Sequence, residues 1–162
     1  MFANLHGFIS ASRIQDKYRC IQVADGSQQA AQVHLEQNDL KKADETAYQS
    51  MLIAAQGLVR TQMRDITDDP EQIVTEFKKR FYDTQLFQGP DAGQYAGGKF
   101  ALYLLNRHAD KDPALNVDRV RHLIEEAQLF IEAAYSCHHR MTEQRARDMA
   151  AFNLPAAAEA TV

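Results

Sequence analysis

The chain has 162 residues, of which 45% are hydrophobic and 25% charged, a composition typical of a globular protein with one hydrophobic core. Its 18 Lys and Arg residues against 22 Asp and Glu residues give a formal net charge of -4. This acidic balance disfavours a nucleic-acid partner, because nucleic acids select a basic protein surface.

The two cysteines, Cys20 and Cys137, lie far apart in the sequence. They are too few for a disulfide framework and too distant for a Cys-x-x-Cys site, so we expect a reduced, cytoplasmic protein. No apolar run approaches the roughly 20 residues that span a bilayer, and we expect no membrane association. The opening sequence "MFANLHGFISASR" has no basic start followed by an apolar stretch, and we expect no signal peptide.

Residues 1–26 are predicted to be an N-terminal extension or linker, and residues 27–150 a helical bundle. The first helix of the bundle is expected to begin after an Asp-Gly pair, with Ser27 as its N-cap. A serine hydroxyl at that position accepts a hydrogen bond from a free N–H of the first turn. Residues 151–162 are expected to form a frayed tail.

The stretch 38–63 is predicted to form one long helix with a continuous apolar stripe. Its apolar residues recur at steps of three and four. Several are alanines, which let a neighbouring helix approach closely and therefore also suit self-association. The stripe consists of Ala43, Ala47, Met51, Ala54, Ala55, Leu58, Val59 and Met63.

A third helix is predicted to follow, because the stretch "DDPEQIVTEFKKRFYDT" begins with a complete start signal. Asp69 is the expected cap, Pro70 occupies the first helical position and Gln72 the third. The buried face is expected to consist of Ile73, Val74, Phe77 and Phe81.

A Gly/Pro-rich segment, 89–98, precedes a short and heavily buried helix over 99–108, which the pair Asp112-Pro113 ends. Asn116 is then expected to cap a last amphipathic helix. Its core residues, again at steps of three and four, are Val117, Val120, Ile124, Ala127, Ile131 and Ala134. No stretch alternates as a strand does. The sequence therefore predicts an all-α protein, an up-and-down bundle of four or five helices.

The spacing of Gly93, Gly98 and Lys99 is that of a phosphate-binding loop. Such a loop lies between a strand and a helix and continues with Ser or Thr, which binds magnesium. Here Phe100 follows the lysine and no strand precedes it, so we interpret the glycines as a tight turn into the helix. The free N–H groups at that helix start, together with Lys99, would still suit an anion.

The histidines predict no metal site, because helical bundles hold metals with Glu-x-x-His motifs or with histidines one turn apart. His122 and Glu126 lie one turn apart but on the polar side of the last helix. His138 and His139 are adjacent and therefore point to different faces. Cys137 has no partner acid placed by the sequence, which disfavours a Cys–His nucleophile. We predict no catalytic residue, no metal and no cofactor.

A basic cluster of Arg140, Arg145 and Arg147 follows these histidines. Two interpretations stay open: a surface for an acidic partner, or a solvated helix end that the helix dipole favours.

Four stretches, "KADETAYQSMLIAAQGLVRTQ", "EFKKRFYDTQLF", "YAGGKFALYLL" and "LIEEAQLFIEAA", resemble HEPN-type helical domains. The chain is most similar to the helical domain appended to the C-terminus of some nitrite and sulfite reductase chains. In that group an "AYxxMLxAAxxLL" helix precedes a phenylalanine-containing helix, a glycine turn and a long final helix. The resemblance covers about residues 28–137 and is carried mainly by apolar patterns.

The resemblance implies a four- or five-helix bundle that forms a homodimer. Some members of the group are RNases, and these carry an Arg followed a few residues later by a His on the last long helix. In this sequence Arg119 and Arg121 precede His122 too closely, so those catalytic residues do not carry over. The reductases hold sirohaem and an iron–sulfur cluster on four cysteines, and a chain with two distant cysteines cannot be that catalytic part.

The resemblance thus predicts a non-catalytic accessory or interaction module, associated with a nitrite or sulfite reductase. The alternative is an atypical HEPN-type protein, a nucleotide or RNA binder or a toxin-like RNase. Its anion- or partner-binding site would lie near Gly97, Gly98, Lys99, Arg107 and His108.

Overall fold

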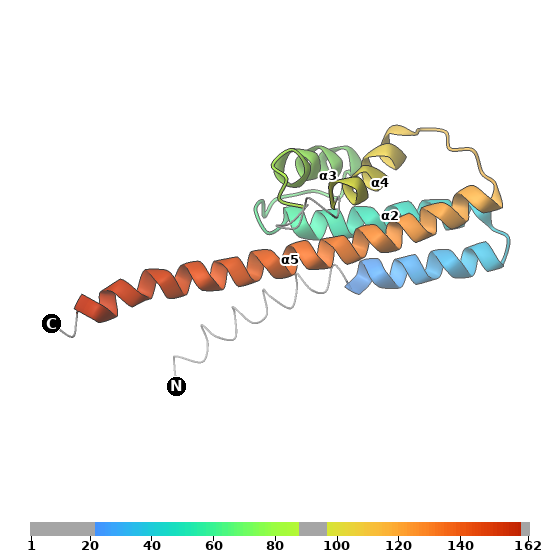
Figure 1. The fold of residues 1–162 in the computed structure, drawn as a ribbon. Coiled ribbons are helices and arrows are strands. Elements are labelled where there is room, and N and C mark those ends of the chain that lie inside the picture. Colours follow the sequence, from blue (N-terminus) through green and yellow to red (C-terminus); the bar gives the residue numbers. More distant parts are fainter. Residues whose placement is uncertain (1–21, 88–96, 160–162) are drawn as a thin grey trace.

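The computed structural model describes residues 22–87 and 97–159 (Figure 1). Every regular element in these ranges is a helix, which confirms the predicted all-α bundle. The elements are a helix over residues 22–36, α2 (Leu40–Val59), α3 (Pro70–Phe77), the π-helical turn η1 (Lys78–Tyr82), α4 (Gly97–Ala109) and α5 (Val117–Glu159).

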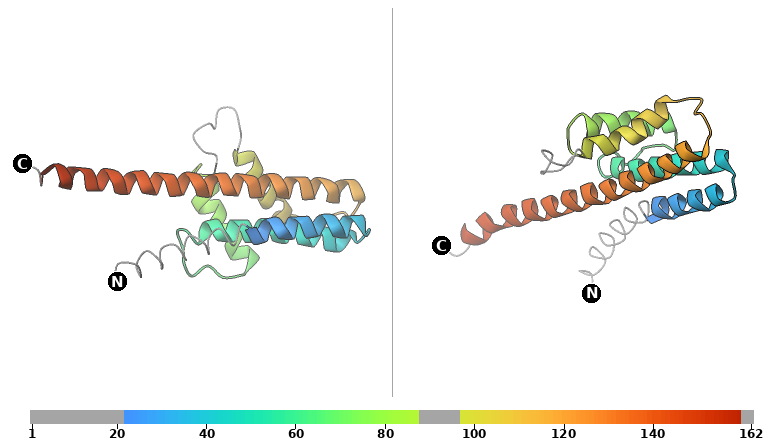
Figure 2. Two further views of the ribbon diagram at one scale, coloured as in Figure 1. Left: turned by 90° about the horizontal axis from the view of Figure 1, so that it is seen from below. Right: turned by 45° about the vertical axis from the view of Figure 1, so that its right-hand side comes forward.

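The helices form two layers around α2. In Figures 1 and 2, α5 and the helix over 22–36 run alongside α2, while α3 and α4 cross its other side. Helix α2 packs most extensively against α5 and α3, and α4 packs against α5. Toward its C-terminal end, α5 continues well past the other helices of the bundle (Figures 1 and 2).

The first helix differs from its prediction, because it already includes residue 22 and continues without a break through the Asp-Gly pair. Ser27 is therefore not an N-cap. The physical reason is an apolar stripe that crosses the glycine: Ala24 and Ala31 are fully buried, and Leu35 packs partly against the core. This burial outweighs the cost of about 1 kcal/mol for Gly26 within a helix. Residues 1–21, which include most of the predicted linker, lie outside the described ranges.

Helix α2 buries the predicted stripe almost completely. Seven of its eight residues are fully buried, and only Met63, beyond the end of α2, is partly exposed. The four alanines of the stripe, Ala43, Ala47, Ala54 and Ala55, have no exposed surface in the single chain. Their predicted role as a self-association surface is wrong, because they let the neighbouring helices approach α2 within one bundle.

Two parts of the start signal of α3 are confirmed, the cap at Asp69 and the proline at the first position, whereas Gln72 bonds to Thr67 and not to the Asp69 backbone N–H. Pro70 is the first residue of the helix, and the Asp69 carboxylate accepts a hydrogen bond from the backbone N–H of Glu71 at 3.4 Å. The first turn of α3 is therefore fixed in position, and Glu71 with it.

An aromatic cluster attaches α3 and η1 to α5. Phe77 and Phe81 stack with their ring centroids 5.9 Å apart, and Phe77 also meets Phe87 at 5.3 Å and Phe130 of α5 at 5.5 Å. All four rings are buried. Pairs of this kind add about 0.5–1.5 kcal/mol to the free energy gained from burial alone.

Helix α5 is longer than predicted. Asn116 accepts a hydrogen bond from the Arg119 backbone N–H at 2.8 Å and thus caps the helix as expected, but the helix continues to Glu159. Five of the six predicted core residues are buried. The exception is Val117, which is 40% exposed because it lies in the first turn, at the edge of the bundle.

Candidate functional site

The five residues of the predicted site lie at opposite ends of α4. Gly97, Gly98 and Lys99 form its first turn, and Arg107 and His108 its last. Arg107 lies eight positions after Lys99, a distance of about 12 Å along the axis at 1.5 Å per residue. The structure therefore brings Arg107 and His108 together and keeps the glycine turn away from them. Gly93 lies outside the described residues.

Arg107 is held by α2 in a buried ion pair. Its Nη2 atom lies 2.6 Å from Oδ2 of Asp44 and its Nε atom 3.3 Å from Oδ1, so the contact is two-pronged. The side chains of Arg107 and Asp44 are only 12% and 5% exposed. The guanidinium group also lies over the ring of Tyr48, 4.5 Å from its centroid. Two-pronged pairing and stacking are the geometries in which arginine is more effective than lysine.

His108 connects three helices through its two ring nitrogens. Nδ1 lies 2.6 Å from the Tyr48 hydroxyl on α2, and Nε2 lies 2.6 Å from Oε2 of Glu71 on α3. A neutral imidazole satisfies both contacts when Nδ1 accepts from the hydroxyl and Nε2–H donates to the carboxylate. Burial raises the pKa of Tyr48 while Arg107 opposes that rise, so the tyrosine keeps the proton that it donates.

An open hollow of about 260 Å³ lies over these residues, between the start of α3 and the end of α4. Three carboxylates (Asp69, Glu71 and Asp110) and three basic groups (Arg107, His108 and Lys111) line it. With His108 neutral, the three carboxylates face two cations, Arg107 and Lys111, so the hollow has no excess positive charge that would select an anion.

The basic groups of the hollow are already paired with protein atoms. Lys111 Nζ lies 3.7 Å from Oε2 of Glu71, and Arg107 is paired with Asp44. Both ring nitrogens of His108 are occupied, so neither can take a proton from a ligand without breaking a contact between helices. The arrangement is therefore suited to holding α2, α3 and α4 together.

A second polar network fixes the segment that leads into α3. Gln56 of α2 donates to the Thr67 carbonyl at 3.0 Å and to Oδ1 of Asp68 at 2.8 Å. Gln72, which the sequence places as a capping-box residue, accepts from the backbone N–H of Thr67 at 3.0 Å and from its hydroxyl. This network sets the position of Glu71 relative to α2.

The remaining candidate histidines do not form a site. His122 is 76% exposed and lies 3.8 Å from Glu125, which fits its prediction as a surface residue. His138 is buried and His139 exposed, so the adjacent histidines do point to different faces. Among the described residues, no three His, Cys, Asp or Glu side chains are grouped as a metal ion would require.

Cys137 is a buried thiol in the core. Desolvation raises its pKa to about 11, although Arg140 opposes the rise. The thiolate is the nucleophilic form, so the thiol is unreactive at neutral pH in the folded chain. This geometry gives no support to a Cys–His nucleophile.

The predicted basic cluster on α5 is spread over different contacts. Arg140 donates to the carbonyls of Leu86 and Phe87 at 3.4 and 3.3 Å. Arg147 lies 3.5 Å from Glu143. Of the three arginines, only Arg145 has neither a hydrogen bond nor an ion pair among the described side chains, and it is exposed.

Sequence reasoning missed the partners of Arg107 and His108. Asp44 and Tyr48 lie one turn apart on α2, inside the alanine stripe, and Asp44 is only 4% exposed. A carboxylate inside an apolar stripe is rarely left without a partner. The position of Asp44 inside the stripe therefore indicates a buried partner, but it does not indicate which basic residue of another helix that partner is.

Comparison of the chain with protein-family models, with curated proteins and with solved structures finds no match. The resemblance to HEPN-type domains thus rests on the sequence motifs alone.

Proposed function

We propose that this chain is a non-catalytic helical interaction module. The observation that supports this function best is that Arg107 and His108, whose side-chain types often act in catalysis, are already bonded to other protein groups. The Arg107 guanidinium and both ring nitrogens of His108 are engaged in contacts that join α4 to α2 and α3. A residue that would act on a substrate needs a free donor or acceptor directed at it.

The class of partner comes from the resemblance, which points to a nitrite or sulfite reductase with sirohaem and an iron–sulfur cluster. With two cysteines, the chain would supply no cluster ligands of its own and would act as the accessory helical part. The surface that it offers is the projecting part of α5, where every described side chain from Thr142 to Phe152 is exposed.

The test is direct binding between the purified chain and a purified sirohaem-containing reductase of the same organism. We expect saturable binding in isothermal titration calorimetry, with no turnover of nitrite or sulfite by the chain alone. The matched variant is the Arg147→Glu, Ala150→Asp double variant, which changes the projecting part of α5 outside its Met149 and Phe152 face and leaves the core intact. We expect it to weaken this binding. Absence of heat at micromolar concentrations, with a folded reductase, would contradict the proposal.

A second candidate is the atypical HEPN-type protein that binds a nucleotide or RNA. The observation in its favour is that two predicted site residues, Arg107 and His108, line one hollow with Lys111. A thermal melt with ATP and magnesium, and incubation with single-stranded and structured RNA, separate the two candidates. The interaction module gives no shift and no cleavage. A shift abolished by Lys111→Ala, a variant outside the buried pairs, would favour the second candidate.

A further inference from the structure

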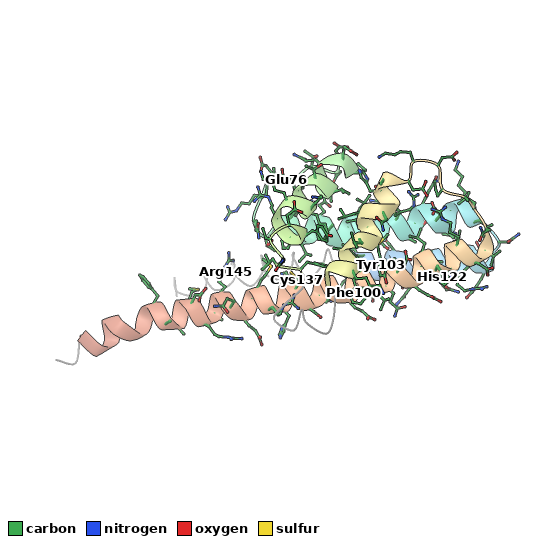
Figure 3. The ribbon with its side chains drawn as sticks, turned by 45° about the horizontal axis from the view of Figure 1, so that its top comes forward. Glu76, Phe100, Tyr103, His122, Cys137 and Arg145 are labelled. Carbon is green, nitrogen blue, oxygen red and sulfur yellow. The ribbon has the colours of Figure 1, made fainter. Side chains whose placement is uncertain are left out.

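The core-facing stripe of α5 does not stop where the bundle ends. Ala134 is fully buried in the core and Met141 packs partly against it. At further steps of four, four and three residues, Arg145, Met149 and Phe152 continue the same face of the helix. Figure 3 shows Arg145 on α5 beyond the end of the bundle. Met149 is 62% and Phe152 84% exposed, so the stripe ends in an uncovered face that carries these two apolar side chains beside the charged Arg145.

The projecting part of α5 lacks the packing that stabilises most helices. In proteins most helical stability comes from tertiary packing of one apolar face and not from intrinsic propensity. The side chains of residues 142–152 are all exposed in the single chain. A partner that covers the face would therefore also stabilise the helix.

We propose that a second copy of this chain covers the face, through antiparallel pairing of the projecting α5 helices. An antiparallel pair with its two-fold axis between Asp148 and Met149 places Arg145 of each copy opposite Phe152 of the other. A guanidinium over an aromatic ring is attractive, the more so when water is excluded. Because one helix carries both groups at the required spacing, the face is self-complementary and the interface is closed by two-fold symmetry.

The charges decide between the antiparallel and the parallel arrangement. The stretch carries two acidic residues, Glu143 and Asp148, and two basic ones, Arg145 and Arg147. A parallel pair would bring Arg145 against Arg145 and Asp148 against Asp148, and such juxtaposition of like charges is costly. In the antiparallel pair, Arg145 lies near Asp148 and Phe152 of the other copy. The alanines of α2 offer no competing surface, because they are fully buried.

This inference deepens the proposed interaction function by naming one partner, and its test is sedimentation of the full chain. We expect the wild type to be a dimer at micromolar concentration and Phe152→Asp to be a monomer with an unchanged circular dichroism spectrum of the bundle. Ala150→Asp, which adds the same charge on the opposite face of α5, is the control and stays dimeric. A wild-type monomer, or a Phe152→Asp dimer, would overturn the inference.

Cysteine cross-linking tests the register in the Cys20→Ser background. Met149→Cys lies next to the proposed two-fold axis, so mild oxidation should give a covalent dimer. Met141→Cys lies about 22 Å from its counterpart along the axis, at 1.5 Å per residue, and should give none. Cross-linking at both positions would show a parallel pair and overturn the proposed register.

Two outcomes keep this inference distinguishable from the proposed function. A monomeric wild type that still binds the reductase overturns the self-pairing alone. A dimer with the expected cross-link that fails to bind any sirohaem reductase leaves the self-pairing in place and contradicts the reductase association. If the wild type is monomeric and Phe152→Asp strongly lowers its free energy of unfolding, then another part of the same chain, residues 1–21, covers the face. That outcome also overturns pairing with a second copy.

Discussion

The two ends of the bundle differ in which side chains they bury and which they expose. At the end where α3 begins and α4 ends, charged groups are buried and paired across helices, as Asp44 and Arg107 are. At the other end, α5 leaves the bundle and exposes Met149 and Phe152. Arg107 and His108, predicted to bind an anion or a partner, are thus used to hold helices together, whereas the exposed apolar side chains lie on the part of α5 that leaves the bundle.

The largest expected effect comes from breaking the buried pair. Arg107→Ala leaves the Asp44 carboxylate, 5% exposed, without its partner, and such a change typically costs about 3–5 kcal/mol of folding free energy. Urea denaturation followed by circular dichroism measures it. Arg121→Ala, which removes an exposed ion pair with Asp118, is the control and should change stability by less than about 0.5 kcal/mol.

An Arg107→Ala variant as stable as the wild type would break the comparison, because the ion pair would then have no structural role. If the same variant keeps its fold but loses a thermal shift that a ligand induces in the wild type, then Arg107 binds the ligand.

Removal of the Tyr48 hydroxyl is expected to lower the free energy of unfolding by a smaller amount. Tyr48→Phe removes the donor to Nδ1 of His108 at 2.6 Å but keeps the ring beneath Arg107. Leaving a largely buried imidazole nitrogen unsatisfied costs about 1–3 kcal/mol. Tyr103→Phe, another partly buried tyrosine, of α4, is the matched control in the same urea titration. Equal effects in the two variants would show that the contact with His108 contributes nothing to stability.

The features of the fold that depend on neighbouring residues in the sequence, such as the apolar stripes of the helices, could be predicted from the sequence. The stripes of α2, α3 and α5 bury their residues as expected, because periodic apolar side chains must face a core in any compact arrangement. The cap of α3 is also local, since Asp69 and Pro70 act within one turn. Val117 shows the limit of this reasoning, because a residue can keep the period and still lie at the edge of the bundle.

Features that depend on tertiary contacts could not be predicted in this way. Ser27 is a reasonable cap by its chemistry, but burial of Ala24 extends the helix past it. Arg107 and His108 do lie together at the end of α4, whereas a site that also includes Lys99 does not fit the length of α4. Their partners Asp44 and Glu71 lie 63 and 37 residues away in the chain, and no spacing in the sequence signals such contacts.

A substitution at Gly26, where an added side chain would meet no neighbour, is expected to stabilise the chain, in contrast to the substitutions at the buried contacts. Gly26 lies within the first helix, and a Cβ atom placed there meets nothing within 4 Å. Gly26→Ala should stabilise the chain by about 0.5–1 kcal/mol, because alanine loses less conformational freedom in a helix. A raised midpoint in urea denaturation is the expected result. A lowered midpoint would show that another part of the protein contacts this helix face in solution.

The smallest effect is expected at Lys99. The residue is exposed in the first turn of α4, where a positive charge meets the positive end of the helix dipole, so Lys99→Ala should be neutral or slightly stabilising. A phosphate-binding loop predicts a different result: ATP with magnesium would raise the melting temperature of the wild type and leave that of Lys99→Ala unchanged. We expect no shift in either protein, because Phe100 packs against the core where a magnesium-binding hydroxyl would be needed. A wild-type shift that Lys99→Ala removes would show that the glycine turn, and not the end of α4, carries the ligand site.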